Sequence, residues 1–272
     1  MVAQRSQATA LILLAGGGFG ARRRSPDPLL TSVLALCAKS HPEVVCVAAA
    51  SGDDARYFAW TAAALREAGA GAVRLVRLTG RRAARAERAR EQLAAADLVF
   101  VSGGDVEAGM QLLTRLRLVG FLRKLYAAGK PFAGVSAGSI LLGRNWIRWA
   151  DPENDASAGL FPCLGLAPLV CDTHAEADAW AELRRLLELQ GPGAAGYGLP
   201  AGGGLRVQPD GSLEALDLPV TRMANREGTV KLLPKLRPAC RDGGRAIRQT
   251  QRAHRPKSRT SAATSSGRSC GR

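Results

Sequence analysis

The chain has 272 residues, of which 46% are hydrophobic, and this is enough for a sizeable core. No apolar run reaches the length of about 18 residues that a membrane helix requires, so we expect a soluble, cytoplasmic protein without a membrane partner. The six cysteines form no C-x-x-C pair and show no metal-ligand spacing, which favours free thiols in a reducing compartment and predicts neither a metal nor another cofactor.

The formal net charge of +15 is concentrated at the end of the chain. Residues 235–272 contain eleven Lys or Arg against one acidic residue, Asp242, which is a net charge of +10 and leaves +5 for residues 1–234. The end segment has few large apolar side chains and cannot bury enough surface to offset the entropy of ordering. We therefore predict a folded domain over 1–234 and a basic, disordered tail over 235–272 with no specific nucleic-acid partner.

Short apolar runs closed by glycine or polar residues alternate with helical patterns through the first half of the chain. Continuous apolar runs indicate parallel strands that are buried on both faces. We expect strands over 8–14, 44–50, 72–78, 96–101 and 131–135, and helices over 28–38, 55–68, 83–95, 106–118 and 121–128. This alternation predicts an α/β fold with a doubly wound, mostly parallel sheet and helices on both faces.

The pattern loosens after residue 145 and then resumes. An apolar run over 169–171 precedes a helical pattern over 175–190, and two strands over 204–207 and 212–216 are joined by a turn over 209–211. No internal repeat interrupts this order.

Polar or glycine-rich segments follow four of the expected strands, at 16–18, 51–54, 102–105 and 136. Ligands of doubly wound sheets bind beyond the carboxyl ends of the strands, so these segments predict a site at one edge of the sheet. Residues 16–21 also fit the dinucleotide fingerprint G-x-G-x-x-A, but the next helix begins only near Pro28 and its N-terminus cannot meet a pyrophosphate there.

A serine lies between two glycines in Gly134-Val135-Ser136-Ala137-Gly138, directly after a strand and before a helix. This arrangement is typical of a nucleophile elbow, whose sharp turn leaves no room for a Cβ atom at either flank. Ser136 would then lie at a helix N-terminus, where unpaired N–H groups can stabilise an oxyanion.

A serine nucleophile needs a base, and the chain has three histidines. His41 lies at the wrong end of the sheet and His254 lies in the tail, which leaves His174. A carboxylate would fix the imidazole tautomer. The residues alone leave four candidates for that role: Asp151, Glu153, Asp155 and Asp172, the last of which can instead cap the following helix.

Three segments together carry a family resemblance: Ser102-Gly103-Gly104-Asp105, the run Gly129-Lys-Pro-Phe-Ala-Gly-Val-Ser-Ala-Gly138, and Asp172-Thr173-His174 before an arginine-containing helix. Over about residues 8–215 the chain resembles the serine peptidase family of dipeptidase E and cyanophycinase. The fold of that family is similar to the class I glutamine amidotransferases, with serine in place of their cysteine.

The resemblance implies specific roles. Ser136 would be the nucleophile, His174 the base and Asp151, 15 residues after the serine, the third triad member. The oxyanion hole would be formed by Gly103, Gly104 and Ala137. The implied substrate is an aspartyl dipeptide or a β-aspartyl-arginine linkage, and the candidates for binding it are Asp105, Arg144 and Arg148.

The chain departs from the family at one place. Many members carry a late Gly-hydrophobic-Asp-Glu segment whose acid can serve the histidine, whereas this chain has Gly198-Leu199-Pro200-Ala201. The leading hypothesis is a serine hydrolase that cleaves short peptides or aspartyl-type amides through an acyl-enzyme. The alternative is an amidotransferase-like binding domain that keeps the cleft without turnover.

Overall fold

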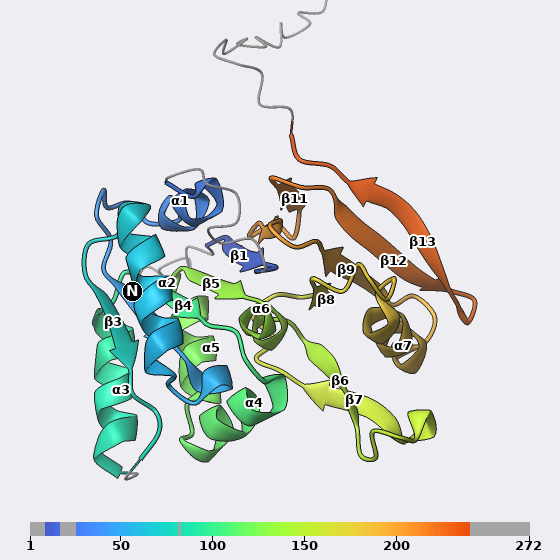
Figure 1. Ribbon diagram of the computed structural model, residues 1–272, viewed down its shortest axis with the longest axis horizontal. Helices are drawn as coiled ribbons and strands as arrows, with labels where there is room; N and C mark the ends of the chain where they lie inside the picture. The colour runs from blue at the N-terminus through green and yellow to red at the C-terminus, as the bar shows by residue number, and fades with distance from the viewer. Residues whose placement is uncertain (1–8, 17–25, 81–82, 240–272) are drawn as a thin grey trace, which may run out of the picture. The chain divides into compact units, whose positions relative to one another are not determined.

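A computed structural model describes residues 9–16, 26–80 and 83–239, and its centre is a seven-stranded sheet in the order β11-β10-β1-β5-β4-β2-β3 (Figure 1). Strands β1, β5, β4, β2 and β3 are parallel, while β10 and β11 are antiparallel additions at one side. The strands of this sheet are β1 (Leu11–Leu14), β2 (Val44–Val47), β3 (Val73–Val76), β4 (Leu98–Val101), β5 (Phe132–Val135), β10 (Gly204–Val207) and β11 (Leu213–Leu216).

Helices cover both faces of this sheet, and the expected doubly wound α/β fold is confirmed. Alternate side chains of β1 pack into the two hydrophobic cores on opposite faces of the sheet: Leu11 and Leu13 belong to one core, and Ile12 and Leu14 belong to the other. Helices α1 and α2 contribute to the core of Leu14, and α3, α4, α5 and α6 to the core of Leu13. The helices are α1 (Pro28–Leu34), α2 (Ala55–Glu67), α3 (Ala83–Ala95), α4 (Val106–Arg115), α5 (Val119–Ala127), α6 (Ala137–Leu142) and α7 (Ala181–Gln190), with single 3-10 turns η1 (Ala49–Ser51) and η2 (Asp155–Ser157).

The region after α6 forms two further sheets. A hairpin pairs β6 (Asn145–Trp149) with β7 (Ala158–Pro162), and a four-stranded sheet runs in the order β13-β12-β9-β8. Its strands are β8 (Val170–Thr173), β9 (Ala195–Leu199), β12 (Val220–Arg226) and β13 (Thr229–Leu236). Of these strands the sequence predicted only the start of β8.

One expected boundary shifts. Strand β13 continues through Leu236, which pairs with Val220, so the folded domain extends past residue 234. Residues 240–272, most of the expected tail, lie outside the described residues, as do 17–25 with most of the glycine-rich loop. Among the residues that are described, none of the helices combines the length and the apolar character needed to span a bilayer.

Candidate active site

Ser136 forms the sharp turn between β5 and α6, at the central strand of the large sheet. Its backbone has φ 52° and ψ −126°, a conformation that L residues adopt only under strain. The turn is held from both sides: the Ser136 N–H donates to Leu14 O at 2.9 Å, and Ser139 N–H donates to Ser136 O at 2.8 Å. The fully buried Ser139 hydroxyl also donates to Leu14 O at 2.8 Å, which fixes α6 to the end of β1.

The flanking glycines are required by close backbone approaches. A Cβ atom on Gly134 would lie 2.6 Å from the carbonyl carbon of Gly138, and one on Gly138 would lie 2.1 Å from Val101 O. Neither space admits a side chain, so the expectation drawn from the glycine spacing is confirmed. The elbow therefore needs both glycines for the same reason: β4, β5 and α6 meet there without side chains between them.

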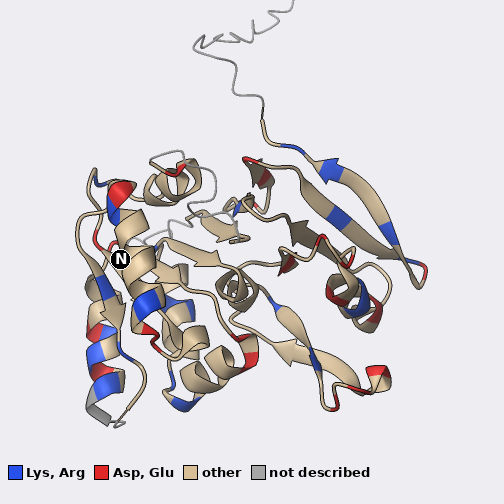
Figure 2. Ribbon diagram, viewed as in Figure 1, with Lys and Arg blue, Asp and Glu red and all other residues tan. Residues whose placement is uncertain are grey.

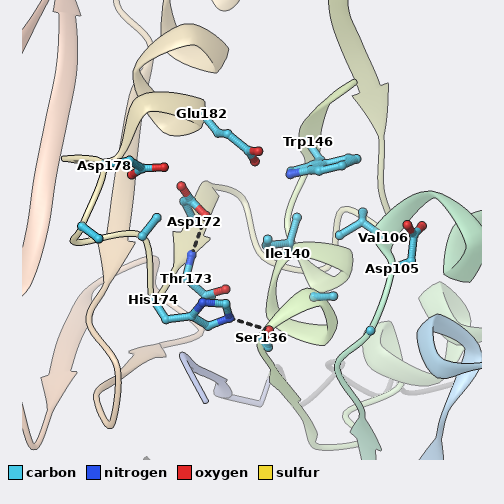
Figure 3. Close-up of a pocket in the computed structure, with 14 residues that line it drawn as sticks. Asp105, Val106, Ser136, Ile140, Trp146, Asp172, Thr173, His174, Asp178 and Glu182 are labelled. Carbon is cyan, nitrogen blue, oxygen red and sulfur yellow. Dashed lines mark hydrogen bonds between the residues drawn. The ribbon is translucent and has the colours of Figure 1, made fainter. Parts of the chain in front are cut away.

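His174 follows β8 and reaches the elbow from the second sheet. Its Nε2 lies 2.8 Å from Ser136 Oγ, within hydrogen-bond distance (Figure 3). The imidazole is exposed, and its backbone is fixed with φ 46° by an N–H donation to Leu199 O at 2.9 Å. The structure thus brings together the serine and the one histidine that sequence reasoning selected.

The loop after β4 lies directly against the elbow. Gly104 has φ 135°, and a Cβ atom there would lie 2.2 Å from Ala50 O, so the loop closes tightly onto η1. Ala137 is the first residue of α6, and its N–H has no partner within the helix. Gly103 is engaged differently: burial raises the pKa of Tyr57, and the Gly103 N–H, which donates to the Tyr57 hydroxyl, offsets part of that rise.

Ser136 lies between two hollows. One is lined by the expected strand ends together with two aromatic side chains of α2: Gly16, Ser51, Asp54, Tyr57, Trp60, Gly103, Gly104, Val135 and Ser136. The convergence of strand ends that the sequence predicted is therefore confirmed for the described residues. The other hollow, of about 400 Å³, lies on the His174 side and also contains Asp105, Asp172, Asp178 and Glu182.

Asp172 is buried in β8, and one of its oxygens accepts a hydrogen bond from the Thr173 N–H at 2.7 Å (Figure 3). Burial raises its pKa to about 7, an effect that the Thr173 N–H partly offsets and the charges of Glu182 and Asp178 increase. Burial also raises the pKa of Glu182, with Asp178 as the second cause, while a hydrogen bond from the Trp146 side chain lowers it.

Three residues expected at the site lie elsewhere. Asp151 is exposed in the turn of the β6–β7 hairpin, where Oδ1 accepts from Glu153 N–H at 3.1 Å. Arg148 pairs with Glu107 at 3.1 Å and lies over the Phe161 ring. Neither these two nor Arg144 is among the residues that line the two hollows beside Ser136, whereas Asp105 lines one of them.

Helix α7 begins at Ala181, six residues later than the sequence indicated. Ala179 and Trp180 adopt positive φ values of 56° and 64°, and Asp178 accepts from the Trp180 N–H at 3.0 Å and from the Ala181 N–H at 3.4 Å. The N-cap residue Trp180 makes no side-chain capping hydrogen bond, and burial raises the pKa of Asp172 to about 7, an effect that its interaction with the Leu183 N–H of the first turn partly offsets. The segment 175–180 becomes a wall of the hollow, which explains why sequence reasoning missed Asp178 and Glu182 as site residues.

Comparison with known proteins matches this arrangement to a family. The model of peptidase family S51 matches residues 11–214, a span that includes the elbow, the Gly103-Gly104 loop and His174. The chain belongs to peptidase family S51. This confirms the resemblance to the family of dipeptidase E, and family S51 membership identifies the protein as a peptidase of the hydrolase class.

Solved structures support the fold of this S51 peptidase. A peptidase from an acI-B1 Actinobacterium is 14% identical with a TM-score of 0.57, over 83% of this chain and 94% of the other. A candidate peptidase E protein from Listeria monocytogenes EGD-e is 17% identical with a TM-score of 0.56, over 76% of this chain and 97% of the other. A search of curated proteins finds no match.

Proposed function

We propose that this member of family S51 is a serine peptidase that cleaves short peptides through an acyl-enzyme on Ser136. The observation that carries the proposal is the 2.8 Å contact between Ser136 Oγ and His174 Nε2, at a strained elbow between two hollows. A nucleophile within hydrogen-bond distance of its base is the arrangement that acyl transfer requires.

In the proposed reaction His174 Nε2 accepts the Ser136 proton as Oγ attacks the peptide carbonyl. The oxyanion that forms is stabilised by the N–H groups of Ala137 and Gly104, whereas the Gly103 N–H, also expected to be a donor, is engaged by the Tyr57 hydroxyl. His174 then gives its proton to the leaving amine. Water, activated by the same imidazole, hydrolyses the ester and restores Ser136.

Asp151 was expected to orient the His174 imidazole as the third member of the triad. Within the described part of the chain, the side-chain hydrogen bond of His174 is the one to Ser136. We propose that the backbone of His174, fixed by its N–H donation to Leu199 O, supplies much of the orientation. The rival function is a binding domain that keeps the fold without turnover, and the position of Asp151 in a distant turn is the observation that favours it.

The proposed substrate is a small peptide, and an aspartyl-type amide belongs in the test panel because of the family resemblance. A cytoplasmic location is supported by the described cysteines Cys37, Cys46, Cys163 and Cys171, all of which are free thiols. The chain binds neither nucleic acid nor membrane in this proposal.

A serine-directed fluorophosphonate probe tests the nucleophile. Labelling of the wild-type chain and its loss in Ser136→Ala are expected, with Ser102→Ala as the matched control that keeps labelling. Mass spectrometry of the labelled peptide locates the adduct. The proposal fails if the wild type stays unlabelled and hydrolyses none of a panel of dipeptides, and the binding-domain alternative then takes its place.

A further inference from the structure

The hollow on the His174 side of Ser136 has an acidic wall. Four carboxylates line it, from the N-cap of α4, from β8, from the segment before α7 and from the first turn of α7: Asp105, Asp172, Asp178 and Glu182. No lysine or arginine is among its lining residues within the described part of the chain. Figure 2 shows acidic positions on β8 and α7, in a chain whose net charge is +15.

One of these carboxylates has an unused acceptor that faces the hollow. Asp172 is only 8% exposed, and its Oδ2 is buried without a hydrogen-bond partner among the described residues, although the backbone N–H of Leu183 interacts weakly with the carboxyl group. In the close-up its carboxyl group lies between Asp178 and Glu182 (Figure 3). A buried acceptor without a donor costs the fold about 1–3 kcal/mol, so its presence beside the nucleophile calls for a ligand that donates to it.

The neighbouring carboxylates leave acceptors available as well. Asp105 Oδ1 accepts from Ala108 N–H at 2.7 Å, and Asp178 Oδ1 accepts from Trp180 N–H at 3.0 Å. The second oxygen of each takes no part in these capping bonds. Glu182 is half-buried and receives a hydrogen bond from Trp146, whose indole provides an apolar surface at the opening of the hollow.

We propose that this hollow binds a cationic group of the peptide substrate, an ammonium or a guanidinium, next to Ser136. The inference rests on the proposed peptidase function and names its substrate class. An aspartyl side chain would be repelled by the same four carboxylates, so in this proposal it does not occupy this hollow.

An organic cation fits these residues better than a metal ion. Among the described residues no three His, Cys, Asp or Glu side chains are grouped closely enough to hold a metal. A planar guanidinium or a three-donor ammonium can instead bridge carboxylates that are farther apart. Binding of such a cation also favours the ionised form of Asp172, so it releases a proton at pH values below the pKa of about 7.

Direct binding to the full-length chain tests the proposal without any turnover. An NMR titration compares n-butylguanidinium with butylurea, a neutral analogue of the same shape. The cation is expected to bind at least about tenfold more tightly. Glu182→Gln should remove most of this preference, whereas Glu188→Gln, which removes the same charge from the exposed face of the same helix, should keep it. Equal binding of the two compounds overturns the proposal.

Hydrolysis assays then identify the source of the cation. Peptides that carry arginine or its neutral isostere citrulline are compared, each with a free or an acetylated N-terminus. Loss of kcat/KM with citrulline assigns the hollow to a basic side chain, and loss on acetylation assigns it to the terminal ammonium. Undiminished kcat/KM for the citrulline peptide with an acetylated N-terminus, which carries neither cation, contradicts the proposal. Absence of fluorophosphonate labelling in the wild-type chain is a separate outcome that refutes the nucleophile and leaves the binding result standing.

Discussion

The buried carboxyl of Asp172 makes stability depend on pH in a direction that can be measured. Its pKa is about 7 in the folded chain, because burial disfavours the ionised form, against an ordinary value of 3.8. The folded state therefore holds the proton more tightly than the unfolded state. The free energy of unfolding therefore falls as pH rises from about 4 to about 7 and levels off above about pH 7. There the buried Asp172 carboxylate lowers it by about 4 kcal/mol relative to acidic pH.

Replacing Asp172 by asparagine removes this dependence while keeping the shape. The asparagine oxygen can still accept from the Thr173 N–H, which is 2.7 Å from the aspartate oxygen. Between about pH 5 and about pH 8 the stability of Asp172→Asn relative to wild type should therefore rise by about 3 kcal/mol. The expected effect of this substitution is therefore a gain of stability relative to wild type on going to neutral pH, although it removes a carboxylate that lines the site.

Urea unfolding followed by circular dichroism at several pH values measures the effect. Asp151→Asn is the matched control, because that aspartate is exposed and accepts one backbone hydrogen bond in the same way. Its stability should follow the pH course of the wild type. If the free energy of unfolding of Asp172→Asn follows the same pH course as that of the wild type between about pH 5 and about pH 8, burial does not disfavour ionisation of Asp172 and the reasoning is refuted.

Two further predictions concern backbone strain at the site. Ser136→Gly should be about 1–2 kcal/mol more stable than Ser136→Ala, because glycine alone adopts φ 52° without strain, and thermal unfolding of the two variants compares them. Gly104→Ala should lose roughly 2 kcal/mol or more, since its Cβ would lie 2.2 Å from Ala50 O at φ 135°. Gly120→Ala in α5, where a Cβ meets nothing within 4 Å, should instead gain up to about 1 kcal/mol, and equal unfolding midpoints for these two would contradict the packing argument.

The parallel half of the fold was predictable because its strands carry a strong signal. Each apolar run between 8 and 135 ends in glycine or a polar residue, and all four residues of β1, β2, β4 and β5 are buried. The elbow was predictable for a related reason, since a serine between two glycines directly after a buried strand is typical of a sharp turn into a helix. His174 followed from elimination among three histidines.

The second sheet gave a weaker signal. Strand β9 contains two glycines in five residues, and one of them, Gly198, leaves space for the Trp180 ring, since a Cβ there would lie 2.5 Å from it. Strand β13 is largely exposed and contains Pro234, as edge strands can. Glu227 and Gly228, both with positive φ, form the tight turn between β12 and β13, and this turn was the available signal for the hairpin.

The acidic hollow could not be predicted because it depends on where α7 begins. The charge pattern places a helix over 175–190, but the left-handed residues Ala179 and Trp180 delay its start to Ala181. Such conformations arise from tertiary contacts, here the packing of Trp180 on Gly198, and not from local preference. The delay places Asp178 and Glu182 beside Asp172 and turns an ordinary surface helix into a wall of the site.

The distance between Ser136 and His174 is set by backbone connections between the two sheets. The segment leading into β8 is tied to the end of α6 by five hydrogen bonds between 2.7 and 2.9 Å: Leu164 N–H to Leu141 O, Gly165 N–H to Gly143 O, Leu166 N–H and Ala167 N–H to Leu142 O, and Arg144 N–H to Leu169 O. These bonds position the start of β8, and the donation from His174 N–H to Leu199 O positions its end. A carboxylate that orients the imidazole affects the rate more than the geometry, since its loss in a serine triad lowers kcat about 10⁴-fold with the residues in place. The close dyad and the absence of an acid at 198–201 are therefore compatible, because the backbone bonds account for the Ser136–His174 distance without an orienting carboxylate.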